Sequence, residues 1–413
     1  MLKISPIDED FVSFDMNRLV ILLLSEMFVS ACTQSDAPVS FAEVLSDAPG
    51  IVGEVLQESD RYHVQIMYSR IHRDSLGKPD PQTFTFRHRP DEYFYPASTV
   101  KFPVAVLALE ACRRLGIDPN ATMITDSSRA FHTPVRADTS SANGLPSVAH
   151  YIRKIFLVSD NDAFNRLYEF VGPETIHRRM SEWGFPDVRI VHRLALSRTR
   201  EQNCILNPIH FLDSVGDTLL SLPERIDSMP AILDPPVMIG KGEMKAGILV
   251  ETPKEFSEKN SFNLRELHDF LMMVIFSGCD TGLKSDLTKE DQVFLKRTMG
   301  MLPYQSDFPR YDRTVHYDSY VKFFLFGDQT EQMPDHIQIY NKVGLAYGWL
   351  TDNAYIVDEE AGIEFFLTAT IWVNDNQIFN DNVYEYDETG FPFLAELGQL
   401  IYDLEKRGGE VVE

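Results

Sequence analysis

The sequence predicts an α/β fold of the α+β type, in which strands from both chain ends form one antiparallel sheet flanked by helices. A mainly helical domain is inserted between the two halves of the sheet. Three observations predict this arrangement. β-Branched and aromatic runs gather near both ends, helical periodicity dominates the middle, and an amphipathic helix at 393–406 closes the chain. The expected strands cover residues 62–72, 83–86, 337–340, 354–357 and 363–373.

The elements follow in order along the chain. Residues 42–59 are expected to form one helix, and a Gly-Lys-Pro-Asp-Pro turn at 77–81 joins the first two strands. The helix over 101–115 is supported by apolar residues at helical spacing and by Pro103 in its first turn, where proline is tolerated. Further helices are expected at 148–157, 162–170, 264–276 and 289–299. The proline-rich stretch 223–262 reads as irregular.

These elements divide the chain into an N-terminal targeting segment and two subdomains. Residues 1–32 are interpreted as an export signal and 33–41 as a tether. An α/β sheet subdomain takes residues 42–110 and 337–407, and a mainly helical subdomain takes 111–336, with an extra segment within 223–335.

Charge and cysteine usage exclude several classes of function. The 413-residue chain carries a net charge of −24 and has no Lys/Arg-rich tract, so a nucleic-acid partner is not expected. It has no Cys-x-x-Cys pair and no His-Glu-x-x-His, so neither a dedicated metal site nor another cofactor is expected. Cys112, Cys204 and Cys279 are interpreted as buried small hydrophobes, and a disulfide among them stays open. A monomer is expected.

The N-terminal segment has the pattern of an export signal. Arg18 precedes the apolar run 19–24, and Val-Ser-Ala-Cys at 29–32 resembles a bacterial lipoprotein signal, which implies lipidation of Cys32. The predicted location is therefore periplasmic, or anchored through lipid at the outer membrane or cell surface, with membrane contact only through that anchor. Glu26 and the acidic residues of 1–15 oppose this reading, although a start at Met16 removes the latter. A buried N-terminal helix is the alternative, and the true start (Met1, Met16 or Cys32) stays open.

Three short motifs occur in order and carry the predicted chemistry. Ser98-x-x-Lys101 begins the strongest helix, Ser159-Asp160-Asn161 lies in an interhelical loop, and Lys342-Val343-Gly344 begins a late strand region. A serine hydroxyl is a weak nucleophile until a base takes its proton. Residues three apart on a helix share one face, so Lys101 can be that base if burial or nearby positive charge lowers its pKa. Lys342 can supply that charge or hold an anionic group, and Gly344 would let a substrate lie close to the strand.

Together the motifs resemble those of the class A β-lactamases and related penicillin-recognising serine hydrolases. The resemblance is tight around Ser98, Ser159 and Lys342 and loose elsewhere. It implies a β-lactamase/transpeptidase-like fold, with Ser98 as nucleophile, Lys101 as base, Ser159 as proton relay, Asn161 as orienting residue and Lys342 as carboxylate anchor. It also implies an oxyanion hole formed by the backbone N–H groups of Ser98 and Leu345.

Three departures from the family pattern bear on function. Val343 stands where the family has a substrate-binding hydroxyl. Asn203 stands where a glutamate activates the hydrolytic water, although Asn207 matches the asparagine that follows, and Glu201 is the candidate substitute if the loop 193–202 lets it reach. The span of 183 positions from Ser159 to Lys342 exceeds that of a typical class A enzyme, so extra material reshapes or covers the pocket.

Three readings follow. The first is a β-lactamase that forms an acyl-enzyme on Ser98 and hydrolyses a β-lactam amide. The second is a penicillin-binding-protein-like D-alanyl peptidase or esterase, which acts on a cell-wall peptide and releases its acyl group slowly. The third is a surface lipoprotein without turnover. The complete set of catalytic serines and lysines favours the first reading, which is the one we expect, and it opposes the third. Val343 and the missing glutamate point to the second reading, which is the alternative.

Overall fold

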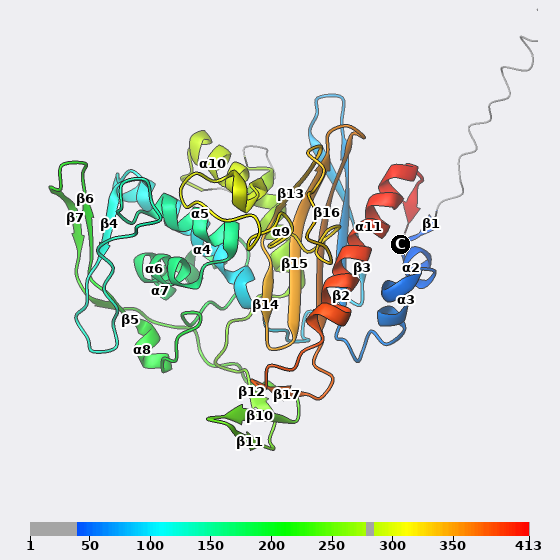
Figure 1. Cartoon of the computed structure of the whole chain (residues 1–413), viewed down its shortest axis with the longest axis horizontal. Coiled ribbons are helices and arrows are strands. Elements are labelled where there is room, and N and C mark those ends of the chain that lie inside the picture. Colours follow the sequence, from blue (N-terminus) through cyan, green and yellow to red (C-terminus); the bar gives the residue numbers. More distant parts are fainter. Residues whose placement is uncertain (1–38, 278–284, 413) are drawn as a thin grey trace, which may run out of the picture.

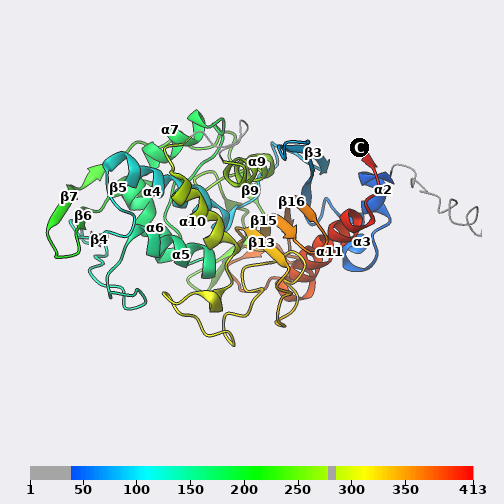
Figure 2. The same cartoon turned by 90° about the horizontal axis from the view of Figure 1, so that it is seen from above.

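A computed structural model describes residues 39–277 and 285–412. Its centre is an antiparallel sheet with strand order β13-β15-β16-β2-β3, and β14 adds to the edge of β15. The first strands of the chain pair with the last, since β16 pairs with β2 from Thr370↔Gln65 to Phe365↔Arg70. Helices cover both faces of this sheet (Figures 1 and 2). The predicted fold class is therefore confirmed.

The helices begin and end as follows: α2 (Phe41–Ser46), α3 (Gly50–Gln57), α4 (Lys101–Leu115), α5 (Val148–Val158), α6 (Asn161–Val171), α7 (Pro173–Glu182), α8 (Arg200–Cys204), α9 (Leu264–Ile275), α10 (Lys289–Gly300) and α11 (Phe391–Arg407). The strands of the central sheet are β2 (Gln65–Arg73), β3 (Pro79–Phe86), β13 (Ile337–Asn341), β14 (Gly344–Ala346), β15 (Trp349–Asp358) and β16 (Ile363–Trp372). The shorter strands are β1 (Val39–Ser40), β4 (Thr122–Thr125), β5 (Ile205–Leu206), β6 (Ile209–Leu212), β7 (Thr218–Leu222), β8 (Arg225–Ile226), β9 (Met238–Ile239), β10 (Gly242–Lys245), β11 (Ile248–Val250), β12 (Lys254–Glu255), β17 (Ile378–Phe379) and β18 (Val411–Val412).

Two apolar cores lie on opposite faces of the central sheet. Successive strand residues point to opposite faces, so Phe366 packs with the helices of the inserted domain, whereas Phe365 packs with α2, α3 and α11. Strands β15 and β16 are buried along nearly their whole length because both of their faces are covered. This sandwich fixes the position of β14, which borders the candidate site.

Three local predictions were wrong. Residues 42–59 form two helices, because Pro49 has no N–H to continue the first and instead precedes the second. Strand β3 begins at Pro79, before the expected residue 83, because it is an edge strand, where proline is tolerated. The turn therefore lies at 74–78, where Asp74 Oδ1 accepts from the N–H groups of Leu76 and Lys78 at 2.8 Å.

The inserted domain contains more strand than its sequence predicted. Strands β4, β6 and β7 form a separate three-stranded sheet, and the stretch 223–262 contains the short strands β8 to β12. β10 pairs with β11 and with β17, so this stretch joins the C-terminal part of the chain in a small sheet below the centre in Figure 1. Strands of two to five residues give too short a pattern for periodicity to detect.

The predicted export signal and Cys32 lie outside the described residues, and so does Cys279. Within the described ranges, Cys112 is buried, Cys204 is half-buried, and both are free thiols. No helix of these ranges has the length and apolar character that crossing a membrane requires.

Candidate active site

Ser98 lies on a short 3-10 helix, Ala97–Val100, which runs directly into α4. It is half-buried, whereas every other residue of 94–101 is buried. The preceding residue, Ala97, has φ of 46°, a left-handed backbone that a residue with a Cβ adopts at a cost of about 1–2 kcal/mol. The turn thus leaves Ser98 partly exposed, whereas its neighbours in the chain are buried.

Ser159 presents its side chain from a second strained turn. It ends α5 with φ of 57°, and Asp160 then begins α6 by accepting the N–H of Ala163 at 2.8 Å. The Ser-Asp-Asn sequence therefore serves as a helix end and a helix start at once. This double role fixes the direction of Ser159 and Asn161 relative to α4.

The structure brings the first two motifs together at the ammonium group of Lys101. Its Nζ donates to Ser159 Oγ at 3.1 Å, to Asn161 Oδ1 at 2.7 Å and to the Ser159 carbonyl oxygen. No hydrogen bond joins Lys101 Nζ to Ser98 Oγ. Three acceptors match the three protons of an ammonium group. The geometry is therefore that of protonated Lys101, which must lose a proton before it can act as a base.

Lys342 completes the constellation from the sheet. Its Nζ donates to Ser159 Oγ at 2.8 Å and to the Val343 carbonyl oxygen at 2.8 Å. Ser159 Oγ is therefore shared by two lysines that come from different halves of the fold. A hydroxyl between two amines can accept a proton from one side and donate to the other.

Burial favours the neutral form of both lysines. It lowers the pKa of Lys101 to about 7, while the nearby Asp160 carboxylate raises this pKa. Burial also lowers the pKa of Lys342 well below its usual value, and the charge of Lys101 lowers it further. A lysine whose pKa is near 7 is partly neutral at physiological pH and can act as a general base.

Gly344 brings the sheet close to the Ser98 turn. A Cβ on Gly344 would lie 2.4 Å from the carbonyl oxygen of Pro96 and 3.1 Å from Thr99 Cγ2. We expected this glycine to make room for a substrate, but its close neighbour is the backbone that precedes Ser98. Leu345 follows on β14 and is 40% exposed. Its N–H and that of Ser98 remain the predicted oxyanion donors.

Val343 and part of the extra segment pack behind the candidate site. The Val343 side chain is buried in the apolar core on the α11 side of the sheet. From the extra segment, Lys322 enters this region fully buried and donates to Asn341 Oδ1 at 2.7 Å. Asn341 in turn donates to Asp352 Oδ1 at 2.8 Å. This part of the segment thus supports the end of β13, directly before Lys342.

The candidates for a deacylation base do not approach the motifs. Glu201 lies exposed at the start of α8, and its carboxylate has no hydrogen bond or ion pair with Ser98, Lys101 or Ser159. The N–H groups of the helix start lower its pKa. In the part of the chain that the structure describes, Glu201 therefore does not reach the motif residues, as a substitute base would have to do.

The two asparagines serve the loop that carries them. Asn203 Oδ1 accepts the N–H of Arg193 at 3.0 Å, and its Nδ2 donates to the Thr199 carbonyl oxygen at 3.0 Å. Asn207 Nδ2 donates to the Asp126 carbonyl oxygen at 2.9 Å. Both side chains are buried. Both asparagines therefore help to close this loop, and substrate binding by Asn203 and Asn207, which the family resemblance implies, stays a prediction.

An aromatic wall beside Ser98 was not predicted. Tyr95 contacts Tyr347 edge-on, with ring centroids 5.2 Å apart, and stacks parallel to His192 at 6.4 Å. Tyr347 follows β14 and has φ of 59°. Single aromatic residues at three distant positions show no pattern in sequence, so only the fold reveals this wall.

With this geometry in place, the comparisons with known proteins can be set beside it. Residues 54–214, which include Ser98, Lys101, Ser159 and Asn161, match the model of the beta-lactamase enzyme family. This match agrees with the resemblance to the class A β-lactamase-like, penicillin-recognising serine hydrolases that the motifs indicated. No curated protein is significantly similar to the chain.

Solved structures show a distant likeness. The chromosome-encoded beta-lactamase of Vibrio parahaemolyticus is 14% identical with a TM-score of 0.46, over 86% of this chain and 99% of that one. A mutant of PBP-A, in an acyl-enzyme complex with penicillin G, is 13% identical with a TM-score of 0.47, over 90% of this chain and 99% of that one. These scores are too low to carry a conclusion about function.

Proposed function

We propose that this protein is a serine hydrolase that forms an acyl-enzyme on Ser98 with β-lactams or a related amide or ester. The observation that carries the proposal is the shared Ser159 hydroxyl, which receives hydrogen bonds from both Lys101 and Lys342. A buried pair of lysines on one hydroxyl is a proton path. Lys101 follows three positions after Ser98, the only half-buried residue of 94–101.

The acylation step balances within these residues. Neutral Lys101 takes the proton of Ser98 Oγ as that oxygen bonds to the carbonyl carbon of the substrate. The C–N bond of a β-lactam then breaks, and Ser159 passes a proton, replaced from the lysine pair, to the leaving nitrogen. The product is an ester on Ser98, and a water molecule must later cleave it to release the acid.

The same geometry supports slow release of the acyl group. An amide is no general base at neutral pH, and the side chain of Asn203 is occupied by the loop backbone. Glu201 is exposed. We therefore favour the penicillin-binding-protein-like reading, with an ester that persists. The β-lactamase reading stays the second candidate, because the segment matches the beta-lactamase enzyme family.

Intact mass spectrometry over time separates these outcomes. The protein is mixed with a penicillin and a cephalosporin, with Ser98→Ala as the matched control. A mass gain that requires Ser98 and persists for hours supports slow release. A gain that disappears within seconds favours a β-lactamase, and no gain from a folded sample with either drug contradicts the proposal.

We also propose export with lipidation at Cys32, supported by Val-Ser-Ala-Cys at 29–32. The cell fraction and mass of the expressed chain test it. A chain that begins at Cys32 with added acyl mass supports the proposal, and a soluble chain that retains residues 1–31 contradicts it.

A further inference from the structure

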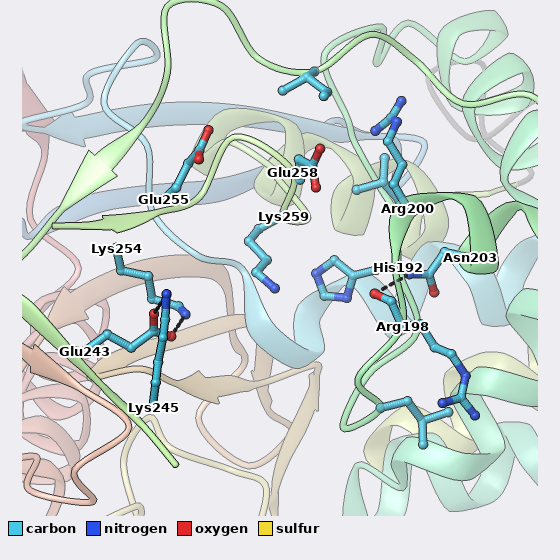
Figure 3. A pocket seen from close by; sticks show the side chains of 13 residues that line it. His192, Arg198, Arg200, Asn203, Glu243, Lys245, Lys254, Glu255, Glu258 and Lys259 are labelled. Carbon is cyan, nitrogen blue, oxygen red and sulfur yellow. Dashed lines mark hydrogen bonds and ion pairs between the residues drawn. The ribbon is translucent and has the colours of Figure 1, made fainter. Parts of the chain in front are cut away.

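A pocket of about 490 Å³ lies between the loop before α8 and the extra segment (Figure 3). The loop side contributes His192, Arg198, Arg200 and Asn203, and the extra segment contributes residues from 232 to 259. None of Ser98, Lys101, Ser159 or Lys342 lines this pocket. It is therefore separate from the carboxylate anchor that the resemblance assigns to Lys342.

The pocket nevertheless adjoins the Ser98 turn. His192 stacks on Tyr95, which lies three positions before Ser98. On the other side, Lys254 Nζ lies 5.4 Å from the ring centroid of Tyr347, which follows β14. The aromatic wall formed by Tyr95 and Tyr347 is thus common to the two regions. We therefore expect an extended substrate that acylates Ser98 to reach this pocket.

The charge of the pocket is opposite to that of the chain. Its lining residues include five basic side chains and three acidic ones, in a protein with a net charge of −24. The basic residues are Arg198, Arg200, Lys245, Lys254 and Lys259. A concave site of one sign concentrates ligands of the opposite sign. The local excess of positive charge therefore favours an anion.

Some of this charge is already neutralised and some is not. Lys245 Nζ lies 3.0 Å from Glu243, which also pairs with Lys254. The ammonium group of Lys259 has neither a hydrogen bond nor an ion pair with any described residue, and Figure 3 shows it pointing toward His192. Arg200 Nη1 is buried without a partner, although Nη2 donates to the Pro230 carbonyl oxygen. Two cationic donors are thus available for a ligand.

His192 adds an acceptor to these donors. Its Nδ1 donates to the Arg193 carbonyl oxygen at 2.7 Å, which leaves Nε2 as the acceptor nitrogen of the neutral ring. Burial lowers the pKa of His192 to about 4, so the ring is neutral at physiological pH. Nε2 is buried and has no partner. A buried acceptor without a donor costs about 1–3 kcal/mol, which a ligand N–H would recover.

We propose that this pocket is an acyl-donor subsite that holds a carboxylate with a neighbouring N–H group, as in an acidic residue of a peptide. Arg200 and Lys259 bind the carboxylate, and His192 Nε2 accepts the N–H. The extra segment therefore selects acidic substrates for Ser98. The link to Ser98 rests on the proposed function, whereas the binding of the anion does not.

The first experiment measures binding without acylation. N-Acetylglutamate α-methylamide is titrated into the full chain carrying Ser98→Ala, by isothermal titration calorimetry, with N-acetylglutamine α-methylamide as the matched probe that has no carboxylate. We expect the glutamate probe to bind more tightly, and Lys259→Met to weaken it by roughly tenfold, the loss of one charge-assisted hydrogen bond. Arg200→Gln should act alike, and the exposed Lys289→Met should change nothing. Equal affinity for both probes, or none at millimolar concentration, overturns the anion site.

The second experiment tests the link to Ser98. Acylation rates are compared for benzylpenicillin and its α-carboxy analogue, whose extra carboxylate lies beside the amide N–H. We expect the analogue to acylate faster, and this preference to disappear in Lys259→Met and in His192→Phe, which keeps a ring on Tyr95. Anion binding without any rate preference overturns the subsite and leaves the proposed function standing. If neither drug acylates Ser98, the proposed function fails, and the calorimetry alone decides the anion site.

Discussion

Replacing Lys342 by methionine should leave the acid limb of the pH dependence of acylation in place. Methionine keeps the length of the side chain and removes its charge. In the wild-type protein, this limb reports the second proton lost by the coupled lysine pair, which leaves Lys101 neutral. This limb is expected near pH 7, where burial places the pKa of Lys101.

The geometry decides which lysine loses its proton first. Lys101 Nζ and Lys342 Nζ lie at most 5.9 Å apart, which is the sum of their hydrogen-bond lengths to Ser159 Oγ. Two unit charges at this distance repel by about 3 kcal/mol at an effective dielectric constant of about 20. That repulsion lowers the pKa of Lys342, which burial also lowers, so Lys342 is the first of the pair to lose its proton. Lys342 is therefore already neutral where Lys101 titrates, and its removal should leave the acid limb in place.

The assay uses a neutral activated ester, because it has no carboxylate that Lys342 would anchor. The acylation rate is measured from pH 5 to 10 for the wild type, Lys342→Met and the surface control Lys289→Met. Asp160→Asn is the variant that should shift the limb. Asparagine still starts the helix, but the loss of the carboxylate that raises the pKa of Lys101 should move the limb below its wild-type position. A limb that moves to higher pH in Lys342→Met would contradict this order of proton loss.

Three further predictions concern turnover, the Ser98 turn and stability. Glu201→Gln should leave the lifetime of the acyl adduct unchanged, because Glu201 is exposed and does not contact the motifs; a markedly longer lifetime by mass spectrometry would identify it as the base. Gly344→Ala should slow acylation and destabilise the fold by about 1–3 kcal/mol, because the new Cβ would lie 2.4 Å from the Pro96 carbonyl oxygen; unchanged urea denaturation and acylation rate would contradict this. Burial raises the pKa of Glu266 to about 7, so the fold loses stability as the pH rises from about 4.5 through 7. The variant Glu266→Gln should therefore be more stable than the wild type by up to about 3 kcal/mol at pH 8, and similar to it at pH 4. Equal denaturation curves of the two proteins at pH 8 would oppose this prediction.

The sequence predicted best where the pattern was long or the chemistry local. The helix at 101–115 begins and ends where it was placed, because Gly116 in a left-handed conformation ends it and apolar residues repeat along it. The pairing of β2 with β16 followed from the strands near both ends of the chain. The contacts of Lys101 with Ser159 and Asn161 join residues of the two motifs singled out in sequence.

Other features depended on contacts between distant segments. The Cβ clash at Gly344 arises only when β14 reaches the Ser98 turn. The commitment of Asn203 to Arg193 and Thr199 depends on the path of one loop. The short strands of 223–262 are held by pairing with each other and with β5 and β17, and two to four residues give no readable period. The pocket beside His192 forms where residues 191–203 meet residues 232–259, and it has no sequence signature.

The most direct test of the central claim is to locate the acyl group in the chain. The protein is treated with benzylpenicillin, digested, and analysed by tandem mass spectrometry. The account predicts the added mass on Ser98 alone, and no added mass at this position in Ser98→Ala. An adduct on another residue, or one that persists in Ser98→Ala, would contradict the assignment of Ser98 as the nucleophile.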